Sequence, residues 1–173
     1  NSLIAPSYAL AGASDDAGLA AARAYQRYDE TLRSYQAVDF DDLIAMPLSA
    51  LERDPAATER WRERLSYLLI DEYQDTNPVQ YRLLKVLVGT RAAFTAVGDD
   101  DQAIYGWRGA TIENLEQLPR DFETLKVIKL EQNYRSDVRI LRSANALIAN
   151  NTKLYDKKLW STRGLGDLIR IVP

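Results

Sequence analysis

Two adjacent carboxylates, Asp71 and Glu72, directly follow an apolar run from Tyr67 to Ile70. A buried strand of this kind delivers the side chains at its end to the carboxyl edge of a sheet, where open α/β sheets bind their ligands. Two acids at that edge suit a phosphate-bound Mg²⁺ ion and an attacking water. The alternative is a strand that ends in a solvated acidic turn, which is the more common meaning of an isolated Asp-Glu pair.

A second polar cluster follows the next apolar run along the chain. Gly98 comes first and is expected to permit a sharp exit from the strand. Asp99, Asp100 and Asp101 form an acidic triplet, and three successive acids usually make a solvated turn. Gln102, directly behind them, is different, because a neutral amide can sense a phosphate oxygen without carrying charge.

Two large aromatic rings and a guanidinium, those of Tyr105, Trp107 and Arg108, come next and are separated by glycines. Such a run in a loop is costly unless the rings are buried or stack on a ligand. Single-stranded nucleic acid fits, because each base stacked on an aromatic ring contributes roughly 1–3 kcal/mol. The alternative is a loop that folds back on the core.

A third apolar run ends in Tyr134, Arg135 and Ser136. Ser136 is expected to cap the helix that follows. Arg135 could reach a phosphate in the manner of an arginine finger, and Tyr134 could stack on a purine base. The alternative is a surface arginine paired with Glu131. Three strand ends that each release a cluster suited to nucleotide chemistry are difficult to obtain by accident.

The elements that position these clusters follow from hydrophobic periodicity and capping residues. Helices are predicted at residues 17–35, 38–53, 78–88, 111–118 and 137–150, with another capped by Asp54 and Pro55. Strands are predicted at residues 65–70, 93–97, 126–130 and 168–172, a loop over the first 14 residues, and a linker at residues 119–124. Strands that alternate with helices predict an α/β protein with a parallel sheet, preceded by a separate helical segment.

The composition excludes several kinds of site. With no cysteine and no histidine among 173 residues, the chain has no disulfide, no thiolate metal site and no imidazole base. Catalysis would therefore use carboxylates, arginine, lysine or a bound metal. The net charge of −3 gives no overall attraction to nucleic acid, although a local groove can still be basic. We see no signal peptide and no apolar run of roughly 18 residues, and we expect a cytosolic protein without a membrane segment.

At these clusters the chain resembles the superfamily 1 DNA helicases of the Rep/UvrD/PcrA type. The run from Asp71 to Asp75 is similar to their Walker B motif, or motif II. The run from Gly98 to Ala110 resembles motif III, and the run from Gln132 to Ser136 resembles motif IV. The run from Asp39 to Leu43 resembles the segment where the chain re-enters the first motor domain in that family.

The resemblance extends over nearly all of residues 38–173, and more loosely over the helices before them. Residues 88–91 and 126–130 lean toward the Rep branch. One departure is Ala103, where the family usually has a serine, and we expect little consequence because that hydroxyl is not a required ligand.

The resemblance implies a role for each residue around the nucleotide, with ATP and Mg²⁺ as the cofactors. Asp71 would hold Mg²⁺ together with Glu72, and Glu72 would polarise the attacking water as the general base. Gln74 would contact the bound nucleotide. Gln102 would contact the γ-phosphate and couple the nucleotide state to DNA.

Further roles follow from the same resemblance. Arg135 would reach the γ-phosphate across the cleft between two motor domains, and Tyr134 would stack on adenine. Tyr105 and Trp107 would stack on DNA bases, with Arg108 beside the strand. The implied activity is ATP-driven 3′-to-5′ movement along single-stranded DNA with unwinding of duplex at single-strand/duplex junctions.

The fold that the resemblance implies is an incomplete RecA-like motor domain. Residues 1–36 would be the tail of the helical insert 1B, residues 37–124 the second part of motor domain 1A, and residues 125–173 the start of motor domain 2A. No G-x-x-x-x-G-K-[ST] run occurs, so the Walker A loop and its lysine are missing. We therefore expect an internal fragment that needs the remainder of a helicase chain to complete its ATP site.

Two other functions are open on the sequence. The chain could be a non-catalytic module that binds single-stranded nucleic acid through Tyr105, Trp107 and Arg108. It could also belong to a helicase–nuclease of the AddA/RecB branch, whose motor motifs are similar.

Overall fold

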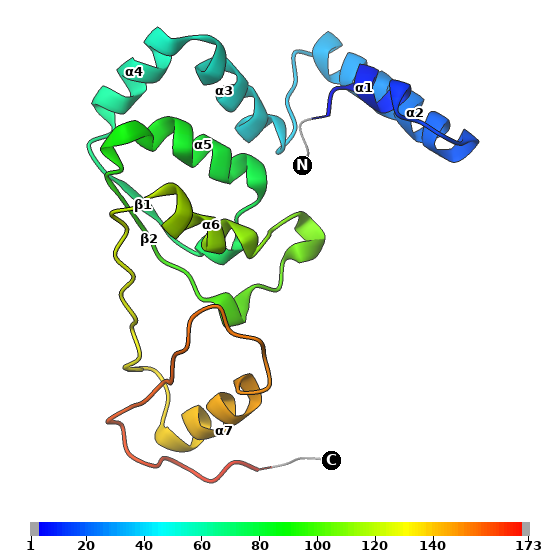
Figure 1. Cartoon of the computed structure of the whole chain (residues 1–173). Coiled ribbons are helices and arrows are strands. Elements are labelled where there is room, and N and C mark those ends of the chain that lie inside the picture. The colour runs from blue at the N-terminus through cyan, green and yellow to red at the C-terminus, as the bar shows by residue number, and fades with distance from the viewer. Residues whose placement is uncertain (1–3, 171–173) are drawn as a thin grey trace.

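A pair of parallel strands, β1 (Leu68–Ile70) and β2 (Phe94–Ala96), lies at the centre of the protein (Figure 1). The structure is a computed structural model that describes residues 4–170. Leu68 pairs with Phe94, and Ile70 pairs with Ala96. Helix α5 (Pro78–Val88) connects the two strands. This strand–helix–strand unit confirms the predicted α/β class, because parallel neighbours need a crossover connection.

The main core lies on one face of this sheet, beneath α5 and α6 (Glu113–Asp121). Side chains alternate across a strand, so Leu68 and Ile70 pack against the core while Leu69 is 79% exposed. The buried members of the core are Tyr73, Tyr81, Leu84, Val88, Phe94, Leu115 and Leu118. Burial of a leucine side chain of this kind contributes about 1.5–3 kcal/mol.

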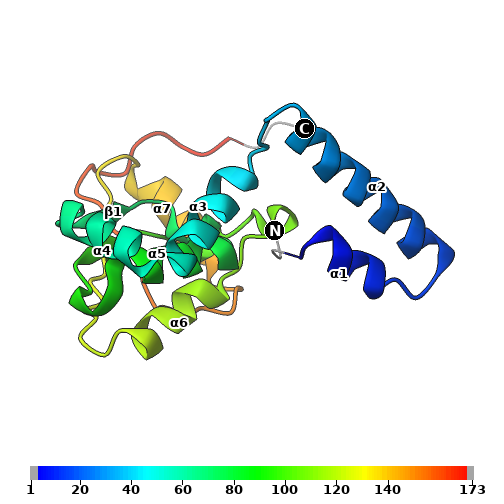
Figure 2. The ribbon, with the colours of Figure 1, turned by 90° about the horizontal axis from the view of Figure 1, so that it is seen from above.

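In the described part of the chain, four helices precede the sheet, α1 (Pro6–Ala11), α2 (Asp16–Ser34), α3 (Asp42–Arg53) and α4 (Pro55–Arg64). Helices α1 and α2 pack against each other and stand apart from the core, as Figures 1 and 2 show. Helices α3 and α4 pack against α5. The predicted cap of α4 is confirmed, because Asp54 accepts from Ala57 N at 3.0 Å. Asp15 caps α2 in the same way and accepts from Gly18 N at 2.7 Å.

The last part of the chain is mostly irregular. After α6 it runs without regular structure to α7 (Val138–Ile148), and then returns toward the sheet (Figure 1). A parallel bridge joins Gln132 to Trp160. Within residues 4–170, no helix combines the length and the apolar character needed to span a bilayer.

Two of the four predicted strands do not form among the described residues. Residues 126–130 form no strand, because no neighbouring strand is present among the described residues, and Ile128 and Leu130 are 77% and 78% exposed. Residues 168–170 also form no strand, while residues 171 and 172 of that prediction lie outside the described part of the chain. The strand predicted at 65–70 is shortened to β1, and that predicted at 93–97 to β2.

The structure also corrects several helix boundaries. Residues 6–11, predicted as loop, form α1, where Pro6 occupies the first turn and needs no hydrogen-bond partner. Helix α3 begins at Asp42 rather than residue 38, because Asp39 and Asp42 first exchange backbone-to-side-chain hydrogen bonds of 3.2 and 2.9 Å. The predicted linker at 119–124 is partly helical, since α6 extends to Asp121. Asp137, not Ser136, is the N-cap residue of α7.

Candidate functional site

Asp71 and Glu72 lie at the end of β1, and both are exposed. The backbone of Glu72 is left-handed, with φ 49° and ψ 44°. That conformation costs a residue other than glycine about 1–2 kcal/mol. It directs the chain into a 3₁₀ turn, η1 (Tyr73–Asp75), and the amide of Glu72 donates to Asp71 Oδ1 at 2.9 Å. The strand end therefore presents two neighbouring carboxylates to solvent, an exposure that the alternative of a solvated acidic turn shares with a site open to a ligand.

Gln74 is 2% exposed and joins the two strand ends. Its Nε2 donates to Glu72 Oε2 at 2.8 Å, and its Oε1 accepts from the backbone amide of Asp99 at 3.0 Å. Gly98 favours this close approach, because a Cβ there would lie 3.0 Å from Gln74 Oε1, a tight contact. The φ of Gly98 is not among the positive values, so the exit from the strand there does not use the left-handed backbone that favours glycine.

Gln102 closes the second strand end in a 3₁₀ turn, η3 (Asp100–Gln102). Its Nε2 donates to Asp99 Oδ2 at 2.6 Å. Asp99 is thus bonded both to Gln102 and, through its amide, to Gln74. We call Glu72, Gln74, Asp99 and Gln102 the polar network. It brings together three of the predicted site residues from two neighbouring strand ends.

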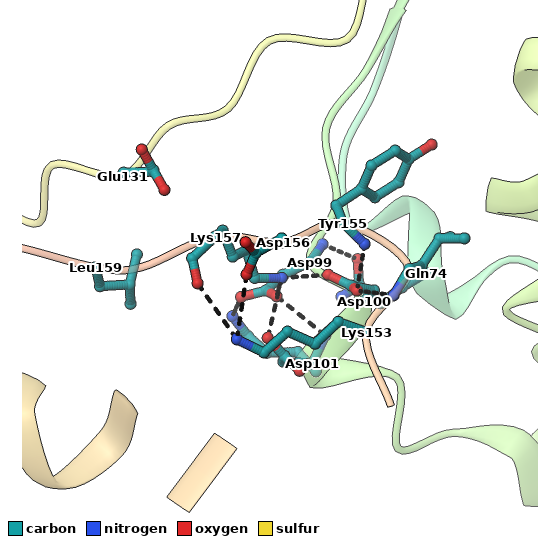
Figure 3. Close-up of polar contacts among 12 residues, drawn as sticks. Gln74, Asp99, Asp100, Asp101, Glu131, Lys153, Tyr155, Asp156, Lys157 and Leu159 are labelled. Atoms are coloured by element: carbon teal, nitrogen blue, oxygen red, sulfur yellow. Dashed lines mark hydrogen bonds and ion pairs between the residues drawn. The ribbon is translucent and has the colours of Figure 1, made fainter. Parts of the chain in front are cut away.

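The acidic triplet is not the solvated turn predicted from sequence. The side chains of Asp100 and Asp101 are only 5% and 9% exposed, because Lys157 lies against them (Figure 3). Lys157 Nζ is 2.5 Å from Asp99 Oδ1 and 3.2 Å from Asp101 Oδ2, and it also bonds Asp100 Oδ1. The three carboxylates lie close enough to hold a cation, and the ammonium of Lys157 provides one.

These contacts shift the pKa values of the groups involved. Burial raises the pKa of Asp99 and Asp100, but hydrogen bonds from Lys157, with further bonds from Gln102 to Asp99 and from the Tyr155 amide to Asp100, outweigh it and leave both pKa values lowered. Burial lowers the pKa of Lys157, and its bonds to the triplet outweigh this and raise it. All of these groups are therefore charged at neutral pH.

The aromatic loop lies at the surface of the protein, in and beside the 3₁₀ turn η4 (Gly106–Arg108). Trp107 is 75% exposed and Tyr105 is 37% exposed, with their ring centroids 6.3 Å apart. Arg108 Cζ lies 4.6 Å from the centroid of the Trp107 ring and 5.3 Å from that of Tyr105. The loop therefore does not bury Trp107 in the core, and the alternative of a folded-back loop is wrong for this residue.

Tyr134 and Arg135 are exposed and lie apart from the polar network. Tyr134 Oη donates to Gln132 Oε1 at 2.8 Å. Within the described residues the guanidinium of Arg135 makes no hydrogen bond or ion pair, so the alternative of a pair with Glu131 is wrong. Glu131 Oε1 instead accepts from the backbone amide of Lys158 at 2.8 Å.

Lys157 belongs to the site but is not indicated by any sequence pattern. Nothing in the neighbouring sequence distinguishes Lys157 from the adjacent Lys158. The only signal was the acidic triplet itself, because three carboxylates that are not solvated need a nearby cation.

The chain is similar in sequence to known DNA helicases. A model of the UvrD/REP helicase N-terminal domain family matches residues 1–123. The chain is 51% identical to the ATP-dependent DNA helicase Rep of Escherichia coli over 172 residues, which are 99% of this chain and 26% of that protein. The same figures hold for the ATP-dependent DNA helicase Rep of Salmonella typhimurium. Identity to the ATP-dependent DNA helicase UvrD1 of Mycobacterium tuberculosis is 45% over 179 residues, with coverage of 98% and 23%.

The chain spans about a quarter of the length of the curated relatives it matches. Its identity to the two Rep helicases exceeds that to UvrD1, in agreement with the predicted lean toward the Rep branch. Because the family match covers well over half of the residues, the chain belongs to the UvrD/REP helicase family.

Proposed function

We propose that the chain is part of the ATP-driven motor of a DNA helicase that moves 3′ to 5′ along single-stranded DNA and unwinds duplex at junctions. The polar network is the observation that carries this proposal, because it joins carboxylate and amide side chains at two neighbouring strand ends, where α/β sheets bind their ligands. In this proposal residues 1–36, 37–124 and 125–173 are parts of the helical insert, the first RecA-like motor domain and the second.

The donor set at the first strand end fits Mg²⁺ held with a nucleotide. Mg²⁺ prefers oxygen ligands and is commonly bound by one or two carboxylates together with substrate phosphates. Asp71 and Glu72 supply such exposed carboxylates. The ion, when bound, would neutralise charge that develops on the transferring phosphate.

Glu72 would then accept the proton of the attacking water. Gln74 holds Glu72 Oε2 and so limits the orientations that the carboxylate can adopt. Gln102 would contact the γ-phosphate, and its bond to Asp99 joins that contact to the rest of the network. A change at the phosphate would therefore be transmitted between the two strand ends through hydrogen bonds.

Arg135 and Tyr134 would approach the nucleotide from the segment before α7. The guanidinium of Arg135 has no partner within residues 4–170, and the ring of Tyr134 is 72% exposed. Both are therefore accessible, Arg135 to a γ-phosphate and Tyr134 to adenine. Because neither contacts the polar network, the proposal requires the nucleotide to bridge them.

We further propose that the chain alone binds ATP weakly and does not turn it over, since it has no glycine-rich phosphate loop. The test is phosphate release with single-stranded DNA, measured for the full-length protein and for the 173-residue chain. Turnover by the full-length protein alone is the expected result. Turnover at the same rate by the chain alone would contradict this part, and absence of DNA-stimulated turnover in the full-length protein would contradict the motor function.

A second function, binding of single-stranded nucleic acid without catalysis, is favoured for the chain by the exposed aromatic loop. A stacked base contributes roughly 1–3 kcal/mol, so loss of the Trp107 ring should weaken binding several-fold or more. We expect Trp107→Ala to reduce oligonucleotide affinity in fluorescence anisotropy. Trp61→Ala is the matched control, because Trp61 is 47% exposed on α4 and contacts Arg64 instead. Equal affinities for Trp107→Ala and the unchanged chain would contradict stacking.

A further inference from the structure

The segment after α7 is attached to the acidic triplet by both backbone and side chain. Asp100 Oδ2 accepts from the amides of Leu154 at 3.0 Å and Tyr155 at 3.2 Å, while Lys157 contacts all three acids (Figure 3). The side chain of Lys157 is 20% exposed. A lysine side chain is rarely buried to this extent unless several acceptors bind its ammonium, so the attachment is specific.

The same segment is also attached to the part of the chain that carries Arg135. The amide of Trp160 donates to Glu131 O at 3.0 Å, and the amide of Asn133 donates to Trp160 O at 2.7 Å. Asn133 Oδ1 in turn accepts from the amide of Arg135 at 2.9 Å. Residues 154–160 therefore connect the backbone around Arg135 to the acidic triplet.

The charge of Lys157 offsets the repulsion within the triplet. The carboxylate oxygens of Asp99, Asp100 and Asp101 lie within 4.8 Å of one another, and like charges at that separation repel. Without the ammonium, rotation of a carboxylate away from its neighbours relieves this repulsion. Rotation of Asp99 would remove the acceptor of Gln102 Nε2, which is 2.6 Å away.

We propose that Lys157 is a positioning residue. It holds Asp99 in the orientation that fixes Gln102, and it couples the segment that carries Arg135 to the polar network. The effect on ATP turnover rests on the proposed function, whereas the effect on the geometry of Asp99 and Gln102 does not. Lys157 itself does not touch a reacting atom in this proposal.

The first test is the kinetics of ATP turnover with single-stranded DNA in the full-length protein. Lys157→Met removes the charge with little change in length, and we expect about tenfold or greater loss of kcat with the KM for ATP changed less than about threefold. Lys157→Arg keeps the charge and should recover most of the rate. Lys158→Met is the matched control, because Lys158 is exposed and, among residues 4–170, only its backbone amide is bonded. A kcat for Lys157→Met equal to that of the unchanged protein would overturn the proposal.

The second test does not depend on activity. The amide of Asp101 donates to Asp99 Oδ1 at 3.1 Å, and that of Gln102 donates to Asp99 O at 2.9 Å. Hydrogen exchange of these two amides in the full-length protein should be at least several-fold faster in Lys157→Met, with α5 unchanged. Lys157→Arg and Lys158→Met should exchange as the unchanged protein does.

The outcomes of the two tests separate the proposals. Faster exchange in Lys157→Met supports positioning even if the unchanged protein hydrolyses no ATP, a result that would overturn only the motor function. Unchanged exchange at Asp101 and Gln102 overturns positioning. In a third outcome, the amides of Lys157→Met exchange faster throughout the protein, including α5. Lys157→Arg then separates the two explanations. Equally fast exchange in Lys157→Arg overturns a role for the charge, and exchange as slow as in the unchanged protein supports that role.

Discussion

Glu72 combines an unfavourable backbone conformation with a restrained side chain. Its φ of 49° is left-handed, a conformation that is unfavourable for a residue other than glycine. Its carboxylate accepts a hydrogen bond from Gln74 Nε2. Strained positions persist only where the surrounding structure determines them, and they concentrate at functional sites. Here the amide of Tyr73 donates to Val97 O at 2.9 Å directly after the strained residue, which fixes the turn.

The charge of Glu72 should therefore matter for turnover and little for folding. Glu72→Gln keeps an oxygen that accepts from Gln74 but removes the base, and general-base catalysis contributes about 10²–10⁴-fold. We expect a loss of that order in DNA-stimulated phosphate release by the full-length protein, with the thermal midpoint nearly unchanged. Glu123→Gln, at an exposed position, is the control. Turnover retained in Glu72→Gln would exclude Glu72 as the base.

For individual residues, the sequence predicts which side chains lie at strand ends better than it predicts contacts between residues far apart in the chain. The sequence places Asp71 and Glu72 at one predicted strand end and Gln102 at the next, and Gln74 links Glu72 to that second strand end. Arg135 follows the third predicted strand, which does not form among residues 4–170. Lys157 was not predicted, because it lies 57 residues after Asp100, which it contacts. No local pattern encodes such a contact.

Helix α6 is attached to the first strand end through one buried amide. Asn114 is 2% exposed, and its Nδ2 donates to the carbonyl oxygen and to Oγ1 of Thr76, at 3.0 Å each. The amide of Thr111 also donates to Thr76 O at 3.1 Å. These bonds hold the turn after Asp71 and Glu72 against the helix that covers the core.

Removal of that amide should lower the stability of the fold. Asn114→Ala leaves Thr76 with fewer partners and a small void, and we expect a loss of about 1–3 kcal/mol in the free energy of unfolding. Urea unfolding followed by circular dichroism measures it. Arg120→Ala, at an exposed position of the same helix, should change stability by less than about 0.5 kcal/mol. Equal effects of the two substitutions would contradict the role of Asn114.

The contact between Lys157 and the acidic triplet should also have a defined pH range. The pKa values of Asp99 and Asp100 are lowered from 3.8, so their contribution is complete above 3.8 and is lost as pH falls through the lower folded values. The pKa of Lys157 is raised from 10.5, so its contribution is complete below 10.5 and is lost as pH rises through the higher folded value. Burial and the charge of Asp100 also raise the pKa of nearby Tyr155 above its ordinary value, so it is neutral at neutral pH.

We therefore expect the contact to be constant between those limits and to weaken at both extremes. The chain has no cysteine, so dyes can be attached at Arg120→Cys on α6 and Arg142→Cys on α7. Energy transfer between them should not change over the neutral range and should fall only below 3.8 or above 10.5. A transition near neutral pH would contradict this pairing of charges. Lys157→Met should lower the transfer throughout the range.

Helices were predicted more accurately than strands for a physical reason. Helix α5 has the predicted bounds because its signals are local: the capping box formed by Asn77 and Gln80, and Gly89 directly after its end. A strand exists only when another strand pairs with it. Residues 126–130 have the apolar pattern of a strand, but none of the described residues pairs with them.

The protein as a whole is organised around a sheet with only one covered face. Parallel sheets normally carry helices on both faces. Here α5 and α6 cover one face, while Tyr67, Leu69 and Val97 on or beside the two strands are 55%, 79% and 49% exposed. No third strand pairs with β1 or β2 within residues 4–170, so the outer edges of both strands are open.

Open strand edges beside exposed apolar side chains favour association between chains. We therefore expect the 173-residue chain to self-associate at roughly micromolar to millimolar concentration, as seen by light scattering during size-exclusion chromatography. Leu69→Lys places a charge on the open face and should shift the chain toward monomer, because burying that charge against another chain is costly. Leu147→Lys is the matched control, since Leu147 is 71% exposed on α7, away from the sheet. A monomeric unchanged chain at all concentrations, or equal effects of the two substitutions, would show that the open face does not drive association.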